Sequence, residues 1–213
     1  MYNNSLSIVF LLLAVITIVA QVLTGLRQYN IFLIEHNQNS VSILQYLSSG
    51  HFIEATFENW ESEFFQMGLF VWFTVFLRQK GSSVSKGLQG KEEVDRKPQK
   101  HPNAPWAVRK GGFILSVYKH SLTFSLFLLF ILSFGLHWYG SNKDFNQTQQ
   151  LEGKITESMG AYLSNSRFWF ESFQNWQSEF LSVFAIIFLS IYLREIGSAQ
   201  SKPVDAPNAE TEK

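Results

Sequence analysis

The chain contains 213 residues, of which 46% are hydrophobic and only 16% are charged, and its formal net charge is zero. The charged fraction lies well below the roughly 25% of soluble domains, and no run of like charges favours nucleic acid as a partner. Cysteine is absent, which excludes disulfides, thiolate metal sites and cysteine nucleophiles.

The first apolar segment covers residues 6–26 and carries no charge. As a helix it is long enough to cross a hydrocarbon core of about 30 Å. The alternative is a signal peptide, which is disfavoured because no Lys or Arg precedes the segment and no clean Ala-x-Ala site follows it. The sequence therefore predicts a transmembrane span over 6–26, followed by an outer loop with a short helix near residues 41–47.

The next apolar segment, residues 64–77, has only 14 uncharged residues, a length that suits either a span or a buried helix. If the chain returns through the bilayer, the span extends over about 58–78 and Trp60 lies in the interfacial aromatic belt. The helix is expected to begin near Phe52, to project beyond the outer surface and to carry Glu54 and Glu58 into water. The first hairpin then occupies residues 1–80.

Residues 81–119 form the predicted cytoplasmic connection. Ten Lys or Arg residues lie between Arg78 and Lys119, which places this connection inside by the positive-inside rule. Its first part is rich in Gly, Ser, Lys and Gln and predicts a flexible linker. Residues 104–119, with Trp106 as an anchor, predict an interfacial helix on anionic lipid.

The second half repeats the same order. Residues 122–138 are uncharged and predict a span over about 121–139. A second arm over about 174–194 has Trp176 at the interface, so that the second hairpin covers 120–196. The polar tail, 197–213, is predicted to be disordered. Both termini are then cytoplasmic and both inter-helix loops lie outside.

An internal match connects the two halves. At an offset of 116 residues, Asn-Trp-Glu-Ser-Glu-Phe at 59–64 falls on Asn-Trp-Gln-Ser-Glu-Phe at 175–180. A self-match at one fixed offset indicates one structural unit used twice. The predicted fold is therefore an all-α membrane protein of two tandem transmembrane hairpins with four spans, arranged as a parallel repeat.

A polar cluster is predicted near the outer end of each hairpin, because helical spacing puts the polar residues of the repeated motif on one face. Gln21 is expected to lie near Glu63, and His137 near Glu179. These groups either fix helix packing or form a binding or proton-handling site, and the sequence leaves both open. The candidate residues are Gln21, Asn59, Glu63, Gln66, His137, Asn175, Glu179 and Ser182.

Cofactors and metals have little support in the sequence. His51 and Glu54 are spaced to meet on one helix face, but the second half has Arg167 and Phe170 at the corresponding positions. A zinc site needs about three or four protein ligands, so no metal site is predicted. The spans also lack a facing pair of haem ligands, a Ser-His-acid arrangement and a Gly-rich phosphate loop.

Four phrases resemble a known family: Tyr-Leu-Ser-Ser-Gly-His-Phe at 46–52, Ala-Thr-Phe-Glu-Asn-Trp-Glu-Ser-Glu-Phe at 55–64, Arg-Phe-Trp-Phe-Glu-Ser-Phe-Gln-Asn-Trp-Gln-Ser-Glu-Phe at 167–180 and Ser-Lys-Pro-Val-Asp-Ala-Pro at 201–207. The family comprises small bacterial four-helix integral membrane proteins and is catalogued only as a domain of unknown function. The resemblance implies a bacterial inner-membrane protein and brings no activity or residue roles.

Three functions remain open. The first is a non-enzymatic interaction or envelope-associated module, with a second copy or another membrane protein as partner. The second is a small transporter or channel-like protein that uses the outer-rim polar cluster, and the third is a membrane-embedded enzyme. Transport through one copy is disfavoured because the central stretches 70–76 and 183–191 are almost entirely apolar.

Overall fold

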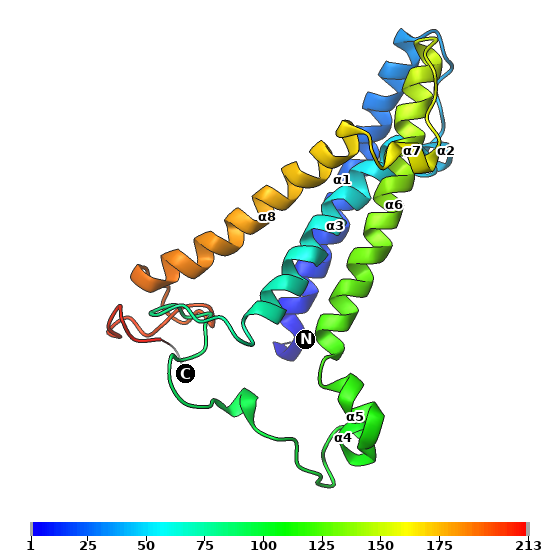
Figure 1. Ribbon diagram of the computed structural model, residues 1–213. Helices are drawn as coiled ribbons and strands as arrows, with labels where there is room; N and C mark the ends of the chain where they lie inside the picture. The colour runs from blue at the N-terminus through cyan, green and yellow to red at the C-terminus, as the bar shows by residue number, and fades with distance from the viewer. Residues whose placement is uncertain (1, 212–213) are drawn as a thin grey trace. The chain divides into compact units, whose positions relative to one another are not determined.

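The computed structural model describes residues 2–211, and these residues form helices and irregular segments without a β-strand (Figure 1). Met1, Glu212 and Lys213, which fall in the predicted first hairpin and tail, lie outside the described residues. The predicted all-helical class is confirmed. The long helices in the described part are α1 (Ser5–Glu35), α3 (Gly50–Phe73), α6 (Ser121–Leu151) and α8 (Ser166–Tyr192).

The short elements lie between these long helices. Ser42 begins α2 by accepting a hydrogen bond from the backbone N–H of Gln45, and Ser158 begins α7 in the same way through Ala161. Such caps satisfy amides that have no partner inside the helix. The short elements are η1 (Tyr2–Asn4), α2 (Ile43–Leu47), η2 (Glu93–Asp95), α4 (Trp106–Lys110), α5 (Gly112–Tyr118) and α7 (Met159–Tyr162).

Two of the helices, α1 and α6, are long and apolar enough to cross a membrane. Large apolar side chains on α1, among them Phe10 and Leu11, are 65% exposed. Such exposure is costly in water and is favourable in lipid. By length and composition, α1 and α6 are thus the two candidate membrane spans among the described residues.

The chain divides into two compact units. The first unit runs up to Asn59 and includes Ser133–Glu171, whereas the second comprises Trp60–Leu132 and the residues from Ser172 onward. The helices α3, α6 and α8 each contribute residues to both units.

The core of the first unit is built on tyrosine. Tyr29 and Tyr46 are buried with Leu33, and the two rings lie 5.6 Å apart between centroids. Two glycines allow close helix contact. A Cβ atom at Gly50 would lie 2.3 Å from the backbone nitrogen of Asp144, so the start of α3 packs directly on the backbone of α6. At Gly140 a Cβ atom would lie 2.5 Å from the backbone nitrogen of Glu54.

The second unit packs through aromatic rings. The ring centroid of Phe65 lies 4.8 Å from that of Phe130 and 4.8 Å from that of Trp176. The indole Nε1 of Trp176 donates a 2.9 Å hydrogen bond to Oε1 of Glu61, whose side chain is buried. This bond satisfies a carboxylate that apolar surroundings would otherwise penalise.

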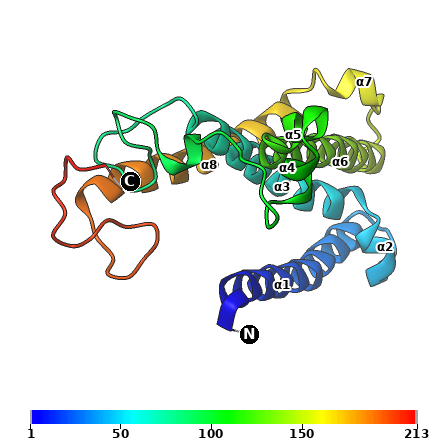
Figure 2. The ribbon, with the colours of Figure 1, turned by 90° about the horizontal axis from the view of Figure 1, so that it is seen from below.

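The connection after α3 and the tail also belong to the second unit. Within the predicted interfacial segment 104–119, α4 and α5 are adjacent short helices, and Gly111 between them adopts a φ of 74° (Figure 2). In the tail, Nζ of Lys202 donates to the backbone carbonyl oxygens of Pro207, Asn208 and Glu210. Ser82 and Ser190 join the connection to α8 through their hydroxyl oxygens, 3.0 Å apart.

Candidate functional site

Charged side chains from three helices meet in the first unit around Arg167. Its Nη2 lies 2.9 Å from Glu54 Oε1 and 2.9 Å from Asp144 Oδ2, and its Nε lies 2.7 Å from Glu171 Oε1. The three carboxylate side chains are only 13–15% exposed. One guanidinium therefore serves three largely buried acids, and the cluster is negative in excess when all of them are ionised.

The pKa values of Glu54 and Glu171 are shifted in opposite directions. Burial raises the pKa of Glu54 to about 9, and the charges of Asp144 and Glu171 add to burial against the attraction of Arg167. Burial would also raise the pKa of Glu171. Its hydrogen bonds with His137, Ser141 and Arg167 outweigh burial and hold its pKa at about 2. Glu54 thus keeps its proton at neutral pH, while Glu171 is ionised.

Glu171 joins the charged cluster to a second polar group. Its Oε2 accepts a 2.7 Å hydrogen bond from the hydroxyl of Ser141 and lies 3.4 Å from Nε2 of His137. The hydroxyl groups of Ser141 and Tyr162 lie 2.7 Å apart. His137 is fully buried, with its ring centroid 4.9 Å from that of Phe168. The imidazole is therefore fixed in place by apolar packing as well as by Glu171.

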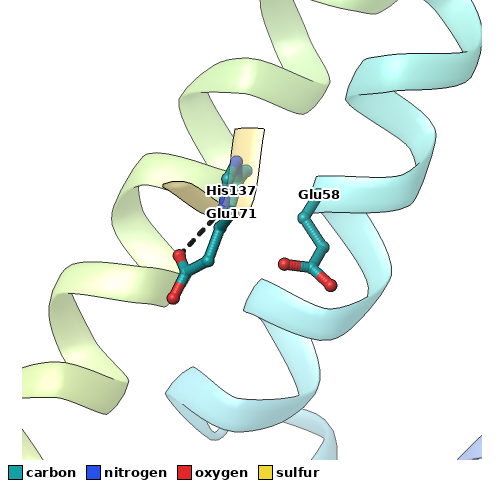
Figure 3. Close-up of side chains that lie close together, drawn as sticks. All are labelled: Glu58, His137 and Glu171. Carbon is teal, nitrogen blue, oxygen red and sulfur yellow. Dashed lines mark hydrogen bonds and ion pairs between the residues drawn. The ribbon is translucent and has the colours of Figure 1, made fainter. Parts of the chain in front are cut away.

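Glu58 completes a group of three possible ligands with His137 and Glu171. One ligand atom from each of the three side chains lies within 4.8 Å of the others (Figure 3). The three come from α3, α6 and α8, respectively. Figure 3 shows the carboxyl groups of Glu58 and Glu171 on the two sides of the space between α3 and α6.

Helical spacing explains why these side chains converge. Glu54 and Glu58 are four residues apart on α3, as are Arg167 and Glu171 on α8. His137, Ser141 and Asp144 follow one another at intervals of four and three on α6. Residues at these intervals share one face of a helix, so that each helix directs one polar face toward the cluster.

A neutral polar network lies elsewhere in the same unit. The hydroxyl of Tyr29 donates to Gln147 Oε1 at 2.7 Å, and the hydroxyl of Tyr46 is hydrogen bonded to Nδ1 of His51 at 3.1 Å. Burial lowers the pKa of His51, so its ring is neutral at physiological pH. Burial likewise raises the pKa of Tyr46 to about 12, which keeps its phenol protonated.

An open groove of about 710 Å³ lies in the first unit. Leu33, Leu151 and Met159 supply an apolar part of its lining, and Tyr139 and Lys143 line it as well. Six of the twelve lining residues carry side-chain amides, which both donate and accept hydrogen bonds. These amides belong to Gln38, Asn39, Asn142, Asn146, Gln147 and Gln150.

The predicted pairing of His137 with Glu179 is wrong, because His137 meets Glu171, eight residues earlier on α8. Eight residues of helix correspond to about 12 Å, which the histidine cannot span. Gln21 Nε2 donates to Thr56 Oγ1 at 3.3 Å. The expectation that Glu54 lies in water is also wrong, since Glu54 is buried against Arg167.

In the second unit, the carboxyl groups of Glu63 and Glu179 lie close enough to interact electrostatically. Gln66, three residues after Glu63, is buried and lines an apolar cavity of about 300 Å³ together with Phe180. The hydroxyl of Ser182 donates to the backbone carbonyl of Glu179 at 2.8 Å. The remaining predicted residues have other surroundings: Asn59 donates to the carbonyl of Ala55, Asn175 lies in α8, and Trp60 and Trp106 are exposed.

Sequence reasoning missed Arg167, Asp144, Glu171 and Ser141 as members of one site. The available signal was the paired spacing of Glu54 with Glu58 and of Arg167 with Glu171, which are intervals typical of charged faces on helices. His51 and Glu54, considered as a metal pair, have different main contacts in the structure, with Tyr46 and Arg167 respectively.

A family model described as a domain of unknown function (DUF6766) matches residues 1–213. No curated protein and no solved structure matches the chain. The chain belongs to the DUF6766 family, and the predicted resemblance to a family of unassigned function is confirmed.

Proposed function

Because the family brings no assigned activity, we propose a function from the residues of this chain alone. The chain is a four-span protein of the bacterial inner membrane that acts as a non-enzymatic interaction module. Its two hairpins place both connections between long helices at the outer face, where the groove of the first unit binds an extended segment of a partner protein. The amide-lined groove is the observation that carries this proposal.

Matching details in the two halves support the proposed duplication. Asn30 and Val41 exchange two hydrogen bonds, with Nδ2 to O at 3.1 Å and N to Oδ1 at 2.7 Å. Asn146 and Glu157, 116 residues further on, exchange the same two bonds at 2.8 and 2.7 Å. The helices α1 and α6 each have 31 residues, and α3 and α8 also start 116 residues apart.

The membrane topology rests on apolar length and on charge. The helices α1 and α6 have spanning length, and α3 and α8, which end at Phe73 and Tyr192, contain most of the apolar stretches 64–77 and 180–193. The basic connection beyond Arg78 favours a cytoplasmic position for that segment and for both termini. Nζ of Lys110 lies 5.1 Å from the ring centroid of Trp106, a pairing suited to the surface of anionic lipid.

The lining of the groove indicates its occupant. The side-chain amides of Gln38, Asn39 and Gln150 can pair with peptide N–H and C=O groups without regard to sequence. The apolar residues Leu33, Leu151 and Met159 can receive apolar side chains. Two residues of the groove wall are held in place before any partner binds, because Asn142 and Asn146 both donate to the carbonyl oxygen of Glu157. A pre-formed wall lowers the ordering cost of binding.

Photo-crosslinking in intact cells tests this function. A photoreactive phenylalanine analogue at Gln150, in the groove, is expected to give a discrete crosslinked product, whereas the same analogue at the nearby exposed Glu152 is not. Tyr139→Ala, on the groove lining, should reduce the yield several-fold. Equal products from both positions would contradict the proposal. The mass of the product distinguishes another membrane protein from a second copy of this chain.

The topology has its own test, because a chain without cysteine accepts single reporter cysteines. Ser40→Cys should react with an impermeant maleimide added to intact cells, and Asp95→Cys should react only after the membrane is opened. The reverse pattern would show that the orientation is inverted. It would leave the groove and its chemistry unaffected.

Proton-coupled transport is a second candidate, favoured by the contact between Glu63 and Glu179. The two carboxyl groups lie close enough to interact, carboxyl groups held close together can share a proton, and the two positions are 116 residues apart. In proteoliposomes, such a transporter should move protons, and Glu179→Gln should abolish the movement while Glu35→Gln should not. Proton permeability equal to that of empty liposomes would remove this candidate.

A further inference from the structure

We propose that Glu58, His137 and Glu171 form a binding site for one divalent transition-metal ion, with Zn²⁺ as the best match. This site does not depend on the proposed interaction function. The ion would join α3, α6 and α8 within the first unit through two carboxylates and one imidazole, and water would complete the coordination.

The spacing of the ligand atoms is compatible with a bound metal ion as well as with the hydrogen bond between His137 and Glu171. His137 Nε2 and Glu171 Oε2 are 3.4 Å apart, and all three ligand atoms lie within 4.8 Å of one another. Two ligands held about 2.1 Å from a tetrahedral Zn²⁺ lie roughly 3.4 Å apart. The His137–Glu171 edge therefore already has the length that zinc requires, and the Glu58 oxygen, within 4.8 Å of both other ligand atoms, is near enough to complete the site.

Formal charge supplies an independent reason for a cation. Glu54, Asp144 and Glu171 contact the one guanidinium of Arg167, and Glu58 lies beside Glu171, so acidic groups outnumber basic groups in this cluster even while Glu54 keeps its proton. Uncompensated charge is costly at a partly buried site. A divalent ion removes most of this excess at the place where the carboxylates converge.

The surroundings resemble the outer shell of a metal site. Ser141 donates to Glu171 Oε2, and Arg167 Nε donates to Glu171 Oε1, so that the carboxylate is oriented from both sides. Phe168 packs on the ring of His137, which is 0% exposed. Groups that orient ligands in this way commonly change metal affinity by roughly 10–100-fold when they are removed.

The ligand set also restricts the metal. An imidazole with two carboxylates suits Zn²⁺, Mn²⁺ or Fe²⁺, whereas Ca²⁺ and Mg²⁺ prefer sites made wholly of oxygen. The described part of the chain offers no thiolate at this site, so the soft ion Cu⁺ is not favoured. Zn²⁺ is placed first because it accepts a tetrahedral site with three protein ligands.

Metal titration of the full chain tests the inference. Protein without a histidine tag is purified in detergent, stripped with chelator and titrated with Zn²⁺ by calorimetry, with Co²⁺ as an absorption probe and Ca²⁺ as a comparison ion. The expected result is one Zn²⁺ per chain, a tetrahedral Co²⁺ spectrum, no comparable Ca²⁺ binding and a higher Tm with zinc. Metal that binds only the folded state raises stability by mass action.

Two substitutions locate the ion, and each introduces glutamine, the residue found 116 positions away. Glu58→Gln and His137→Gln correspond to Gln174 and Gln21. Each should weaken Zn²⁺ binding at least about tenfold, by removing a ligand. Glu152→Gln, at an exposed carboxylate beside Lys154, is the control and should bind as the parent does.

The proposal is overturned if the parent protein shows no saturable Zn²⁺ binding at micromolar concentrations, or if both glutamine variants retain its affinity and stoichiometry. It is also overturned if Ca²⁺ binds as tightly as Zn²⁺. Circular dichroism checks each variant for folding. If His137→Gln does not fold, the result is decided by Glu58→Gln, whose side chain is only partly buried.

Discussion

Two connections between long helices in the first unit share a structural framework and differ in their polar contacts. The first, residues 36–49, joins α1 to α3, and the second, residues 152–165, joins α6 to α8. Each is held by an asparagine that exchanges two hydrogen bonds with the backbone, contains a short helix capped by serine, and buries one tyrosine. One asparagine, one serine cap and one buried tyrosine are therefore the features that the two connections share.

The two connections differ in what the tyrosine hydroxyl meets. The hydroxyl of Tyr46 is hydrogen bonded to the neutral His51 and lies against Gly25, where a Cβ atom would be only 2.1 Å from it. The hydroxyl of Tyr162 is hydrogen bonded to that of Ser141. Ser141 donates to Glu171, which also accepts a hydrogen bond from Arg167. The same framework thus supports a neutral aromatic contact in one case and a charged network in the other.

The largest expected effect comes from Arg167, which follows the second connection at the start of α8 and has His51 as its counterpart in α3. Arg167→Gln should cost about 3–5 kcal/mol of unfolding free energy, because it leaves buried carboxylates without their counter-ion. His51→Gln, at the position 116 residues earlier, should cost only about 1 kcal/mol through the loss of one hydrogen bond. Denaturant unfolding in detergent measures both. Equal losses of unfolding free energy would mean that the charged network stabilises the fold no more than the hydrogen bond of His51 does.

An exchange of the helix residues that face the two tyrosines, Gly25 on α1 and Ser141 on α6, tests these contacts. Gly25→Ser should cost about 1–3 kcal/mol, because its side chain would collide with the hydroxyl of Tyr46. Ser141→Gly, the reverse change 116 residues later, should cost about 2 kcal/mol through lost hydrogen bonds and added helix flexibility. Thermal unfolding of both variants provides the measurement. A neutral Gly25→Ser would show that Tyr46 can move aside.

The sequence was sufficient for the helices and insufficient for their contacts. The predicted spans 6–26 and 121–139 lie inside α1 and α6, because uninterrupted apolar residues mark both helices. The predicted span ends at residue 139, whereas the helix α6 continues to Leu151 through polar residues. Hydropathy locates the part that suits lipid and carries no information on how far a helix extends beyond it.

This extension explains the missed site. The part of α6 beyond residue 139 carries Ser141 and Asp144, and it places His137 opposite the beginning of α8. Arg167 and Glu54 are separated by 113 residues, so no local spacing reveals their contact. The polar faces were visible in the sequence, whereas their pairing depends on the register between helices.

The two asparagines are expected to behave alike. Asn30→Ala and Asn146→Ala each remove two hydrogen bonds to backbone groups of the following loop, and each should cost about 1–3 kcal/mol. The measurement is the unfolding midpoint of each variant, with Asn→Asp at the same positions as a comparison that keeps one acceptor. A cost at only one position would show that the two connections do not share this framework.

The charged network should also make stability depend on pH. The pKa of Glu54 is raised by burial from 4.5 to about 9, so the folded chain retains a proton that the unfolded chain releases. Its contribution to stability is fully present below pH 4.5 and is lost as the pH rises through about 9. Unfolding free energy, measured with chelator present, should therefore fall across this window. Glu54→Gln should flatten the dependence, and a curve unchanged by this substitution would count against a protonated Glu54.

The smallest expected effect is the difference in stabilisation between the hydroxyl groups of Tyr162 and Tyr46. Tyr162→Phe breaks a 2.7 Å contact with Ser141, itself a donor to ionised Glu171, and should cost about 1.5 kcal/mol. Tyr46→Phe breaks a 3.1 Å contact with neutral His51 and should cost about 0.5 kcal/mol. Both rings remain to fill the core, so the difference reports the hydroxyl alone. If Ser141→Ala is introduced first, the cost of Tyr162→Phe should fall toward that of Tyr46→Phe, because the hydroxyl has then lost its link to the charged network.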